Sequence, residues 1–246
     1  MPGIELDGGA QLARLDSWAG RFRTEGEAVP TEPHGRPGEY QRPNGAFEAV
    51  DAEVLYCLLR DLRPRRMIEI GSGWSTLLAA QALSRNAADE PAAPCEFTAV
   101  EPHPRPILLG GRVLIECRVQ EVPLSLFGQL DAGDVLFIDS SHVAAIGSDV
   151  LYEILEILPR LRPGVFVHFH DIFLPANYPR DWVKGLRIHW NEQWFLQAFL
   201  CLNPSFEVVW AGHWMHMTHP DRLEAAFPAY RRDRDRPGSF WIRRVA

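Results

Sequence analysis

Residues 67–76 read MIEIGSGWST, and this stretch decides the fold. A short apolar run is followed by two glycines, Gly71 and Gly73, and then by a segment of helical character. That order is typical of a parallel β-strand that turns tightly into a helix beside a nucleotide-sized ligand. The glycines would let the backbone approach the ligand closely, and the strand would bring Glu69 to the mouth of the crevice.

The stretch also departs from the dinucleotide fingerprint G-x-G-x-x-G, because Thr76 occupies the third glycine position. This departure favours S-adenosylmethionine over a nicotinamide dinucleotide as the cofactor. An NAD-linked oxidoreductase is therefore the weaker alternative.

The chain has 246 residues, of which 46% are hydrophobic, and it carries a formal net charge of −7. This length suits one α/β domain with accessory elements. The negative charge argues against nucleic acid as a partner, since phosphate binding requires a basic surface. The four cysteines are far apart, so neither a zinc knuckle nor a disulfide framework is indicated. No signal peptide or membrane-length apolar run is visible, and we expect a cytoplasmic protein that does not enter the membrane.

The N-terminal part of the chain is predicted to form a cap. Apolar residues at helical spacing indicate a helix over residues 10–23, and prolines mark residues 25–45 as a loop or lid. A second amphipathic helix over residues 47–62 stops before Pro64. We accordingly divide the chain into a helical cap with a proline-rich loop (1–46) and a main domain (47–246).

From residue 66 onward, strand and helix patterns alternate, which predicts a Rossmann-like, doubly wound α/β sheet, mostly parallel and with right-handed crossovers. The predicted strands are residues 66–70, 97–100, 113–117, 135–138, 165–169, 206–210 and 239–242. The predicted helices among them are residues 74–84, 151–161 and 190–202, and residues 86–95 are expected to form a surface loop.

Polar residues close several of these strands. Ligands of such sheets bind outside the carboxyl ends of the strands, so these side chains should gather at one rim. The residues concerned are Glu69, Glu101, Asp139, His170 and Asp171.

The type of each rim residue suggests a role. Glu101 ends the second strand, where its two oxygens can accept hydrogen bonds from adjacent ribose hydroxyls. Asp139 ends a fully apolar strand, where packing does not require an acid, and it could hold a metal, the methionine amine or the substrate. His142 follows on the next loop and is either a general base or an exposed histidine.

Two histidines alternate in the fifth predicted strand. His168 and His170 share one face, and His168, which lies deeper, is expected to be a core residue. Asp139, His170 and Asp171 would together form a site for Mg²⁺, or for Mn²⁺ or Fe²⁺ given the added imidazole. The alternative is a site without metal, in which the same groups bind or deprotonate the substrate.

A second group of histidines forms an H-x-x-H-x-x-H run at His213, His216 and His219. No acidic ligand precedes Asp221 in this stretch. A covering loop or a plain surface segment is therefore favoured over a zinc site.

The order of these motifs resembles that of class I S-adenosylmethionine-dependent methyltransferases. The resemblance rests on residues 69–73, on Glu101 and on Ile138-Asp139, and it extends over roughly residues 47–210 and the closing strand near 240. It implies a seven-stranded sheet whose last strand is antiparallel. It also implies these cofactor-binding residues: Glu69, Gly71, Ser72, Gly73, Ser75, Glu101 and Asp139.

Three stretches, DAEVL (51–55), VHFHDIF (167–173) and WNEQ (190–193), look like those of a bacterial group of these enzymes. That group is similar to magnesium-dependent sugar O-methyltransferases, in which an aspartate after the fourth strand and an acidic pair after the fifth bind the metal. Asp139 matches the first ligand, and His170-Asp171 stands where the pair would be. Two positions depart from that pattern, because one member of the pair is histidine and Ser141 replaces an acidic base.

The resemblance implies methyl transfer from S-adenosylmethionine to a small-molecule acceptor at a hydroxyl oxygen. From their chemistry and their place at the rim, we take His142, His170 and Asp171 as the candidate catalytic residues. The acceptor, the need for Mg²⁺ and the formation of a homo-oligomer stay open. A different class of function is a domain that binds the cofactor as a partner subunit or sensor and transfers nothing. The acid/base cluster argues against it, because a binding domain needs no such groups.

Overall fold

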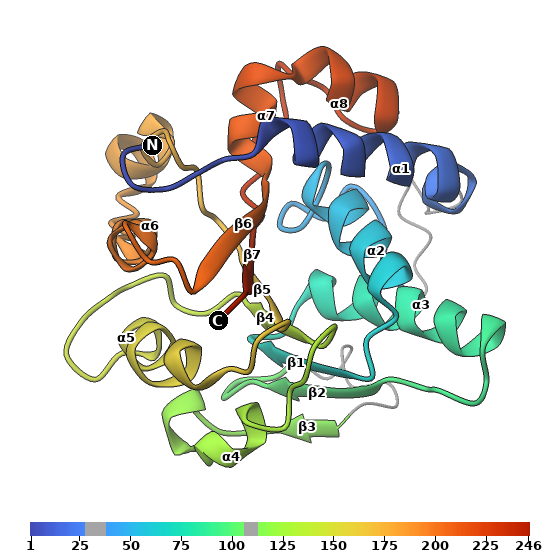
Figure 1. The fold of residues 1–246 in the computed structure, drawn as a ribbon. Coiled ribbons are helices and arrows are strands. Elements are labelled where there is room, and N and C mark those ends of the chain that lie inside the picture. Colours follow the sequence, from blue (N-terminus) through green and yellow to red (C-terminus); the bar gives the residue numbers. More distant parts are fainter. Residues whose placement is uncertain (28–37, 106–112) are drawn as a thin grey trace.

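A seven-stranded sheet runs through the middle of the molecule, with helices on both faces (Figure 1). The computed structural model describes residues 1–27, 38–105 and 113–246. The strands lie in the order β3-β2-β1-β4-β5-β7-β6. Their bounds are β1 Arg66–Ile70, β2 Glu96–Val100, β3 Val113–Ile115, β4 Val135–Ile138, β5 Phe166–Phe169, β6 Phe206–Ala211 and β7 Phe240–Arg244.

Strands β1 to β5 pair in parallel, and β7 runs antiparallel to both of its neighbours, β5 and β6. The predicted doubly wound sheet with an antiparallel last strand is confirmed. The helices are α1 Gly8–Glu27, α2 Asp51–Leu62, α3 Trp74–Asp89, α4 Leu124–Phe127, α5 Asp149–Tyr152, α6 Glu192–Leu200, α7 Gly212–Thr218 and α8 Pro220–Ala226.

The two faces of the sheet belong to two separate apolar cores. Met67 and Phe137 pack on one side with α1, α2, α3, α7 and α8. Ile68 and Leu136 pack on the other side with α4, α5 and α6. Side chains point alternately to the two faces of a strand, and both faces of this sheet are covered by apolar residues. The central strands are therefore nearly continuous runs of hydrophobic residues. By the same alternation, the side chain at position 69 lies on the α2 face.

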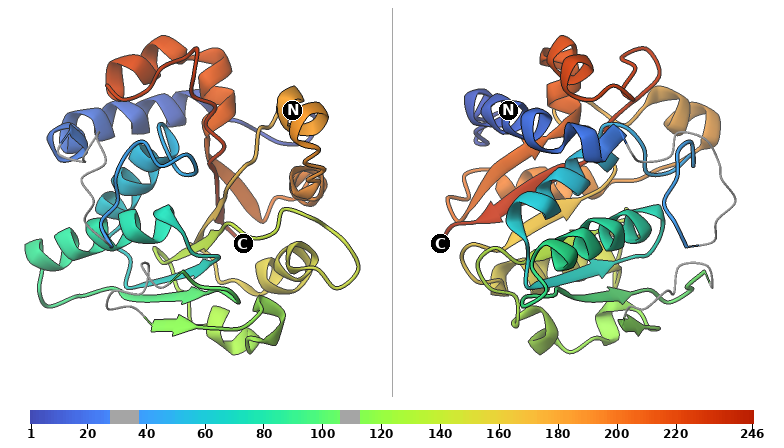
Figure 2. Two further views of the ribbon diagram at one scale, coloured as in Figure 1. Left: turned by 180° about the vertical axis from the view of Figure 1, so that it is seen from behind. Right: turned by 90° about the vertical axis from the view of Figure 1, so that its right-hand side faces the viewer.

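The N-terminal segment joins the two sides of the sheet. Near the start of the chain, the carbonyl of Gly3 accepts a hydrogen bond of 2.9 Å from the Leu202 backbone N–H, just after α6. Helix α1 then runs along α2 and α8 (Figure 2), where the Trp18 and Trp210 rings lie 5.6 Å apart. The described part of the predicted cap thus shares the first core, and a domain boundary at residue 46 stays a prediction.

Some predicted boundaries were wrong for identifiable reasons. Helix α2 begins at Asp51 and not at residue 47, because Asn44 Oδ1 accepts the backbone N–H groups of Ala46 and Phe47 in a turn. Helix α3 continues to Asp89, which shortens the predicted loop.

The predicted helix 151–161 begins earlier, at Asp149, and loses its regular form after Tyr152. It continues as a wide turn (Glu153–Ile157) and a tight turn (Leu158–Arg160) around Pro159, which has no N–H for the helical ladder.

Two other segments differ from the sequence-based expectation. The stretch with His213 and His216 forms helix α7, not a loop, and α8 follows it directly. Of the predicted loop 25–45, residues 25–27 belong to α1 and residues 28–37 lie outside the described part of the chain. In the described ranges, no helix is both long and apolar enough to span a bilayer.

Candidate functional site

The glycine turn between β1 and α3 is shaped by the neighbouring strand. Gly71 has a φ of +96°, and a β-carbon there would lie 2.2 Å from the carbonyl oxygen of Asp139. The Asp139 N–H in turn donates to the Ile70 carbonyl at 2.9 Å. Position 71 therefore excludes any side chain, because the turn and the end of β4 are in direct contact.

Gly73 has a different reason to be glycine. Among the described residues, a β-carbon there would meet Ser75 Oγ alone, at 4.0 Å, so this part of the chain leaves room above Gly73 for a ligand. Its N–H donates to Thr76 Oγ1 at 2.8 Å, which caps the start of α3. The threonine that departs from the dinucleotide fingerprint thus stabilises the helix end.

Glu69 does not stand at the mouth of a crevice, as predicted, because it is wholly buried. It is the fourth residue of β1 and points toward the α3 face of the sheet. Its Oε1 accepts a hydrogen bond of 2.7 Å from Ser75 Oγ. The carboxylate lies beneath the glycine turn, where it fixes the first turn of α3, while Ser72 is half-buried in the turn itself.

Glu101 follows β2 directly and is half-exposed. Its backbone N–H continues the sheet to the Ile115 carbonyl at 3.1 Å. Its Oε1 accepts the His103 N–H at 2.7 Å, which orients the carboxylate at the strand end.

Four side chains meet where β4 and β5 end: Asp139, His142, His170 and Asp171, which we call the quartet. His142 Nε2 lies 3.3 Å from Asp139 Oδ1 and 3.7 Å from Asp171 Oδ2. His170 Nδ1 lies 3.4 Å and 3.6 Å from the same two oxygens. These distances exceed those of good N–H···O bonds, about 2.7–3.2 Å, so the four atoms surround a common point without being tightly bonded to one another.

His142 is held from behind by the start of α6. The Asn191 and Glu192 N–H groups donate to its carbonyl at 3.1 and 3.3 Å. Its Nδ1 lies 2.8 Å from Glu192 Oε2, and Glu192 is almost completely buried. A positive φ of 60° and the Trp190 ring at 4.2 Å complete this fixed placement. The alternative of an exposed loop histidine is therefore wrong, because only 6% of His142 is exposed.

His170 is held in the same manner by α2. Its Nε2 lies 3.5 Å from Asp51 Oδ2, and the Phe47 ring lies 5.0 Å from the imidazole. Asp51 also accepts the backbone N–H groups of Gly238 and Ser239, at 2.8 and 2.9 Å. One buried carboxylate thus connects α2, the start of β7 and the imidazole.

The charges of the quartet support one another. Burial disfavours charge on His142, but its contacts with Asp139 and Glu192 outweigh burial and raise its pKa to about 10. Burial also disfavours charge on His170, but the carboxylates of Asp171 and Asp139 outweigh burial and raise the pKa of His170 well above its ordinary value. Burial alone would raise the pKa of Asp139, yet the two histidines hold it well below its usual range. For Asp171 burial prevails, and its pKa is raised.

The quartet also has the spacing of a metal site. One donor atom each from Asp139, His142 and Asp171 lies within 4.8 Å of the other two. An ion at about 2.0–2.2 Å from each of its ligands would be compatible with such a spacing. The set predicted from the sequence named His170 in place of His142, whereas the structure brings both imidazoles to the two carboxylates.

Other candidates lie away from this centre. His168 is a core residue, as expected: it is fully buried, its Nε2 is 2.9 Å from Ser239 Oγ, and it stacks on Phe137 at 4.0 Å. Ser141 donates its hydroxyl to Asp149 at 2.6 Å. His213 and His216 stack on each other at 5.3 Å in α7.

Two residues of the site, Asp51 and Glu192, were not predicted. Each lies at the start of a helix, where an acidic residue is common because it complements the helix dipole. Their only distinguishing signal was their position in the stretches DAEVL and WNEQ, which carried the family resemblance.

The chain is similar to known proteins over part or most of its length. Residues 68–172, which run from β1 to just after β5, match the family model described as a methyltransferase domain. An uncharacterized protein of Archaeoglobus fulgidus is 32% identical over 135 residues, which cover 52% of this chain and 59% of that protein. The match therefore spans less than two thirds of that relative.

Two solved structures are similar to the chain. An O-methyltransferase from Bacillus cereus, in complex with SAH, is 16% identical over 95% of this chain and 91% of that chain, with a TM-score of 0.45. A variant of the 16S rRNA (adenine(1408)-N(1))-methyltransferase from Catenulisporales acidiphilia is 13% identical over 81% of this chain and 94% of that chain, with a TM-score of 0.34.

Proposed function

We propose that this protein is a class I S-adenosylmethionine-dependent methyltransferase and that it transfers the methyl group to a hydroxyl oxygen of a small-molecule acceptor. The match of residues 68–172 to a methyltransferase domain supports the proposal. The observation that carries the proposal is the quartet. Two buried imidazoles and two carboxylates face one another at the strand ends, beside the glycine turn. A domain that only binds the cofactor has no need for such a costly group of buried charges.

The cofactor would lie over the turn between β1 and α3. Gly73 offers the open backbone there, and Ser72 and Ser75 flank it, with Gly71 and Glu69 fixing its shape. Glu101, at the neighbouring strand end, would accept both ribose hydroxyls. Asp139, which touches the turn through its backbone, would face the methionine part.

The chemistry asks little of the protein beyond alignment. The acceptor oxygen attacks the methyl carbon, a C–O bond forms as the C–S bond breaks, and the electron pair stays on the sulfur of S-adenosylhomocysteine. The hydroxyl proton must pass to a base. In the metal-free quartet, raised pKa values leave His142 and His170 protonated near neutral pH, whereas burial makes Asp171 a stronger base than an ordinary aspartate. We therefore assign proton acceptance to Asp171 and acceptor orientation to the two histidines.

A divalent metal fits the same residues. Asp139, His142 and Asp171 would hold it, with His170 close to the same carboxylates. A donor set that mixes imidazole with carboxylate favours Mn²⁺, Fe²⁺ or Zn²⁺ over Mg²⁺, which prefers oxygen ligands. When bound, such a cation would hold the acceptor hydroxyl and lower its pKa.

Calorimetric titration with S-adenosylmethionine and with S-adenosylhomocysteine tests the cofactor assignment. The chelator-treated protein should bind both ligands, each at one site. A screen of hydroxylated small molecules for S-adenosylhomocysteine release then tests transfer. If neither ligand binds, the glycine turn is only structural and the proposal fails.

The metal is tested separately, by titrating the chelator-treated protein with Mn²⁺ and with Mg²⁺. We expect one Mn²⁺ per chain and weaker Mg²⁺ binding, and we expect the double variant Asp139→Asn, Asp171→Asn to bind neither. Equal Mn²⁺ binding by this variant and by the unaltered protein would exclude the quartet as the metal site. The cofactor assignment would survive that result.

A further inference from the structure

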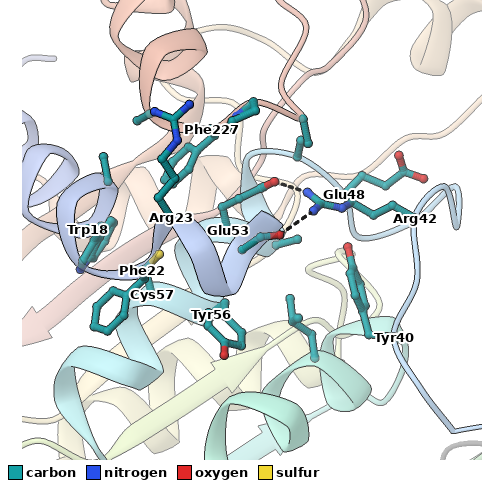
Figure 3. A pocket seen from close by; sticks show the side chains of 18 of the residues that line it. Trp18, Phe22, Arg23, Tyr40, Arg42, Glu48, Glu53, Tyr56, Cys57 and Phe227 are labelled. Carbon is teal, nitrogen blue, oxygen red and sulfur yellow. Dashed lines mark hydrogen bonds and ion pairs between the residues drawn. The ribbon is translucent and has the colours of Figure 1, made fainter. Parts of the chain in front are cut away.

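A cavity of about 600 Å³ lies on the α2 side of the sheet. It is enclosed by α1, α2, the segment after α8 and the segment that precedes α2 (Figure 3). Among the described residues that line it, none belongs to the quartet or to the glycine turn. Cavities of this volume are typical of sites for drug-sized ligands.

The walls of the cavity are aromatic. Trp18 and Phe22 come from α1, Tyr56 from α2, and Phe227 follows α8 directly (Figure 3). These four side chains are buried in the first core, so their positions are fixed by packing. Flat, rigid walls of this kind favour a ring system over a flexible chain, because aromatic groups stack with defined geometry.

The polar groups of the cavity are mostly cationic. The described lining includes two glutamates and four arginines: Arg23, Arg42, Arg231 and Arg234. Asp235, outside the lining, pairs with Arg234, but the arginines still outnumber the carboxylates. This surplus of positive charge favours an anionic ligand, and the planar guanidinium group suits carboxylates and related oxyanions.

One buried ion pair in the lining is incompletely satisfied. Arg42 and Glu53 bond to each other, and their side chains are only 9% and 8% exposed. Arg42 Nε and Glu53 Oε2 nevertheless find no hydrogen-bond partner among the described residues. A buried donor or acceptor without a partner is unfavourable, so a ligand group that reached this pair would gain a hydrogen bond, as an acceptor at Arg42 Nε or as a donor at Glu53 Oε2.

We propose that this cavity is a second binding site, for a small aromatic anion, and that it is distinct from the methyl-transfer site. Aromatic walls would take the ring system, and the arginines would take its acidic group. The site does not depend on the proposed reaction, since it shares no described lining residue with the quartet.

One stretch of chain, residues 40–51, borders both sites. Tyr40, Glu48 and Ala49 line the cavity, whereas Phe47 and Asp51, in the same stretch of chain, contact His170. A ligand in the cavity would therefore rest against the segment that positions this imidazole.

The test uses 8-anilinonaphthalene-1-sulfonate, an aromatic anion whose fluorescence rises on binding, and its neutral analogue N-phenyl-1-naphthylamine. We expect one site per chain for the sulfonate, with at least about tenfold weaker binding of the neutral analogue. S-Adenosylhomocysteine at saturation should not displace the sulfonate. Equal affinity for the two compounds would overturn the anionic class, and displacement would overturn the separateness of the site.

Variants locate the bound probe. Ala19→Trp fills the cavity from a half-exposed position of α1, and Ala52→Phe fills it from α2. Each should weaken sulfonate binding by about tenfold or more. The matched control Ala10→Trp adds the same ring at an exposed position of α1 outside the cavity and should leave the affinity unchanged.

A second control tests whether the sulfonate binds to exposed apolar surface outside the cavity. Phe195→Ala removes an exposed ring on α6 and should leave the affinity unchanged. If Ala19→Trp melts like the unaltered protein and still binds the sulfonate with the original affinity, the cavity is not the site. The same conclusion follows if Phe195→Ala is the variant that abolishes binding.

Discussion

The carbonyl oxygen of Asp139 occupies the space that a side chain at Gly71 would need. A β-carbon at position 71 would lie 2.2 Å from that oxygen, in a backbone conformation with positive φ. This single contact joins the turn that would hold the cofactor to the strand end that carries the quartet. The two halves of the proposed site therefore share one backbone geometry.

Replacement of Gly71 by alanine should damage both halves together. The clash and the positive φ should destabilise the fold by more than about 2 kcal/mol, since the left-handed conformation alone costs an alanine roughly 1–2 kcal/mol. Gly73→Ala is the matched control, because a β-carbon there meets nothing closer than 4.0 Å. Gly73→Ala should melt normally yet bind S-adenosylmethionine more weakly. Equal melting temperatures of the two variants would contradict this account.

Removal of the Glu101 carboxylate should affect only cofactor affinity. Glu101→Ala should weaken S-adenosylmethionine binding by about 1–3 kcal/mol, the typical effect of leaving hydrogen-bonding groups unpaired. Glu96→Ala, at the opposite end of β2, is the control, because Glu96 pairs with Arg66 on the surface. Calorimetry should separate the two variants, and unchanged affinity in Glu101→Ala would remove this residue from the ribose site.

Asp171→Asn should abolish turnover while cofactor binding survives. The amide keeps the shape of the side chain but accepts no proton, and loss of a general base typically reduces rates by about 10²–10⁴-fold. His170→Ala should also lose turnover, through loss of orientation. Binding is measured by titration and turnover by release of S-adenosylhomocysteine. Full activity in both variants would exclude the quartet from the mechanism.

The raised pKa of His142 should depend on Glu192. Burial lowers this pKa, and the contacts with Asp139 and Glu192 raise it to about 10. In chelator-treated Glu192→Gln, the shape is kept and the charge is lost, so the pKa should fall by at least about one unit, which corresponds to roughly 1.4 kcal/mol. NMR titration of the imidazole measures the shift. A pKa that stays near 10 would assign the stabilisation to Asp139 alone.

The stability of the protein should fall in mild acid through His213. Burial, with the neighbouring His216, lowers the pKa of His213 to about 4, below the ordinary value of 6.5. Because the unfolded chain then binds the proton more readily, stability is complete above pH 6.5 and is lost as pH falls toward 4. His213→Gln should flatten the melting temperature over this range, and His189→Gln, at an exposed position, should not. An identical acid slope in His213→Gln would refute the assignment.

Local signals in the sequence were enough to predict the sheet and the rim. The glycine turn, the apolar runs and the polar residues that close them depend on neighbours in the chain, so the predicted strands lie close to the observed ones. The resemblance supplied the antiparallel last strand. The partners of the quartet depend on distant residues. Glu192 reaches His142 across 50 positions, and Asp51 reaches Gly238 across 187. Nothing in a helix-starting acid reveals that it will be buried against an imidazole, and that is why both residues were missed.

The contacts of Gly238 and Ser239 determine when the quartet can form during synthesis. Asp51 and His168 find their partners at these two positions, and β5 is covered on its open edge only by β7. When β1 to β5 and residues up to Asp171 have been synthesised, all four residues of the quartet are present. Gly238 and Ser239, which bind Asp51 behind His170, have not yet been made. The arrangement of the quartet therefore depends on residues far along the chain, and a chain interrupted before residue 238 would lack the contacts that hold Asp51 behind His170.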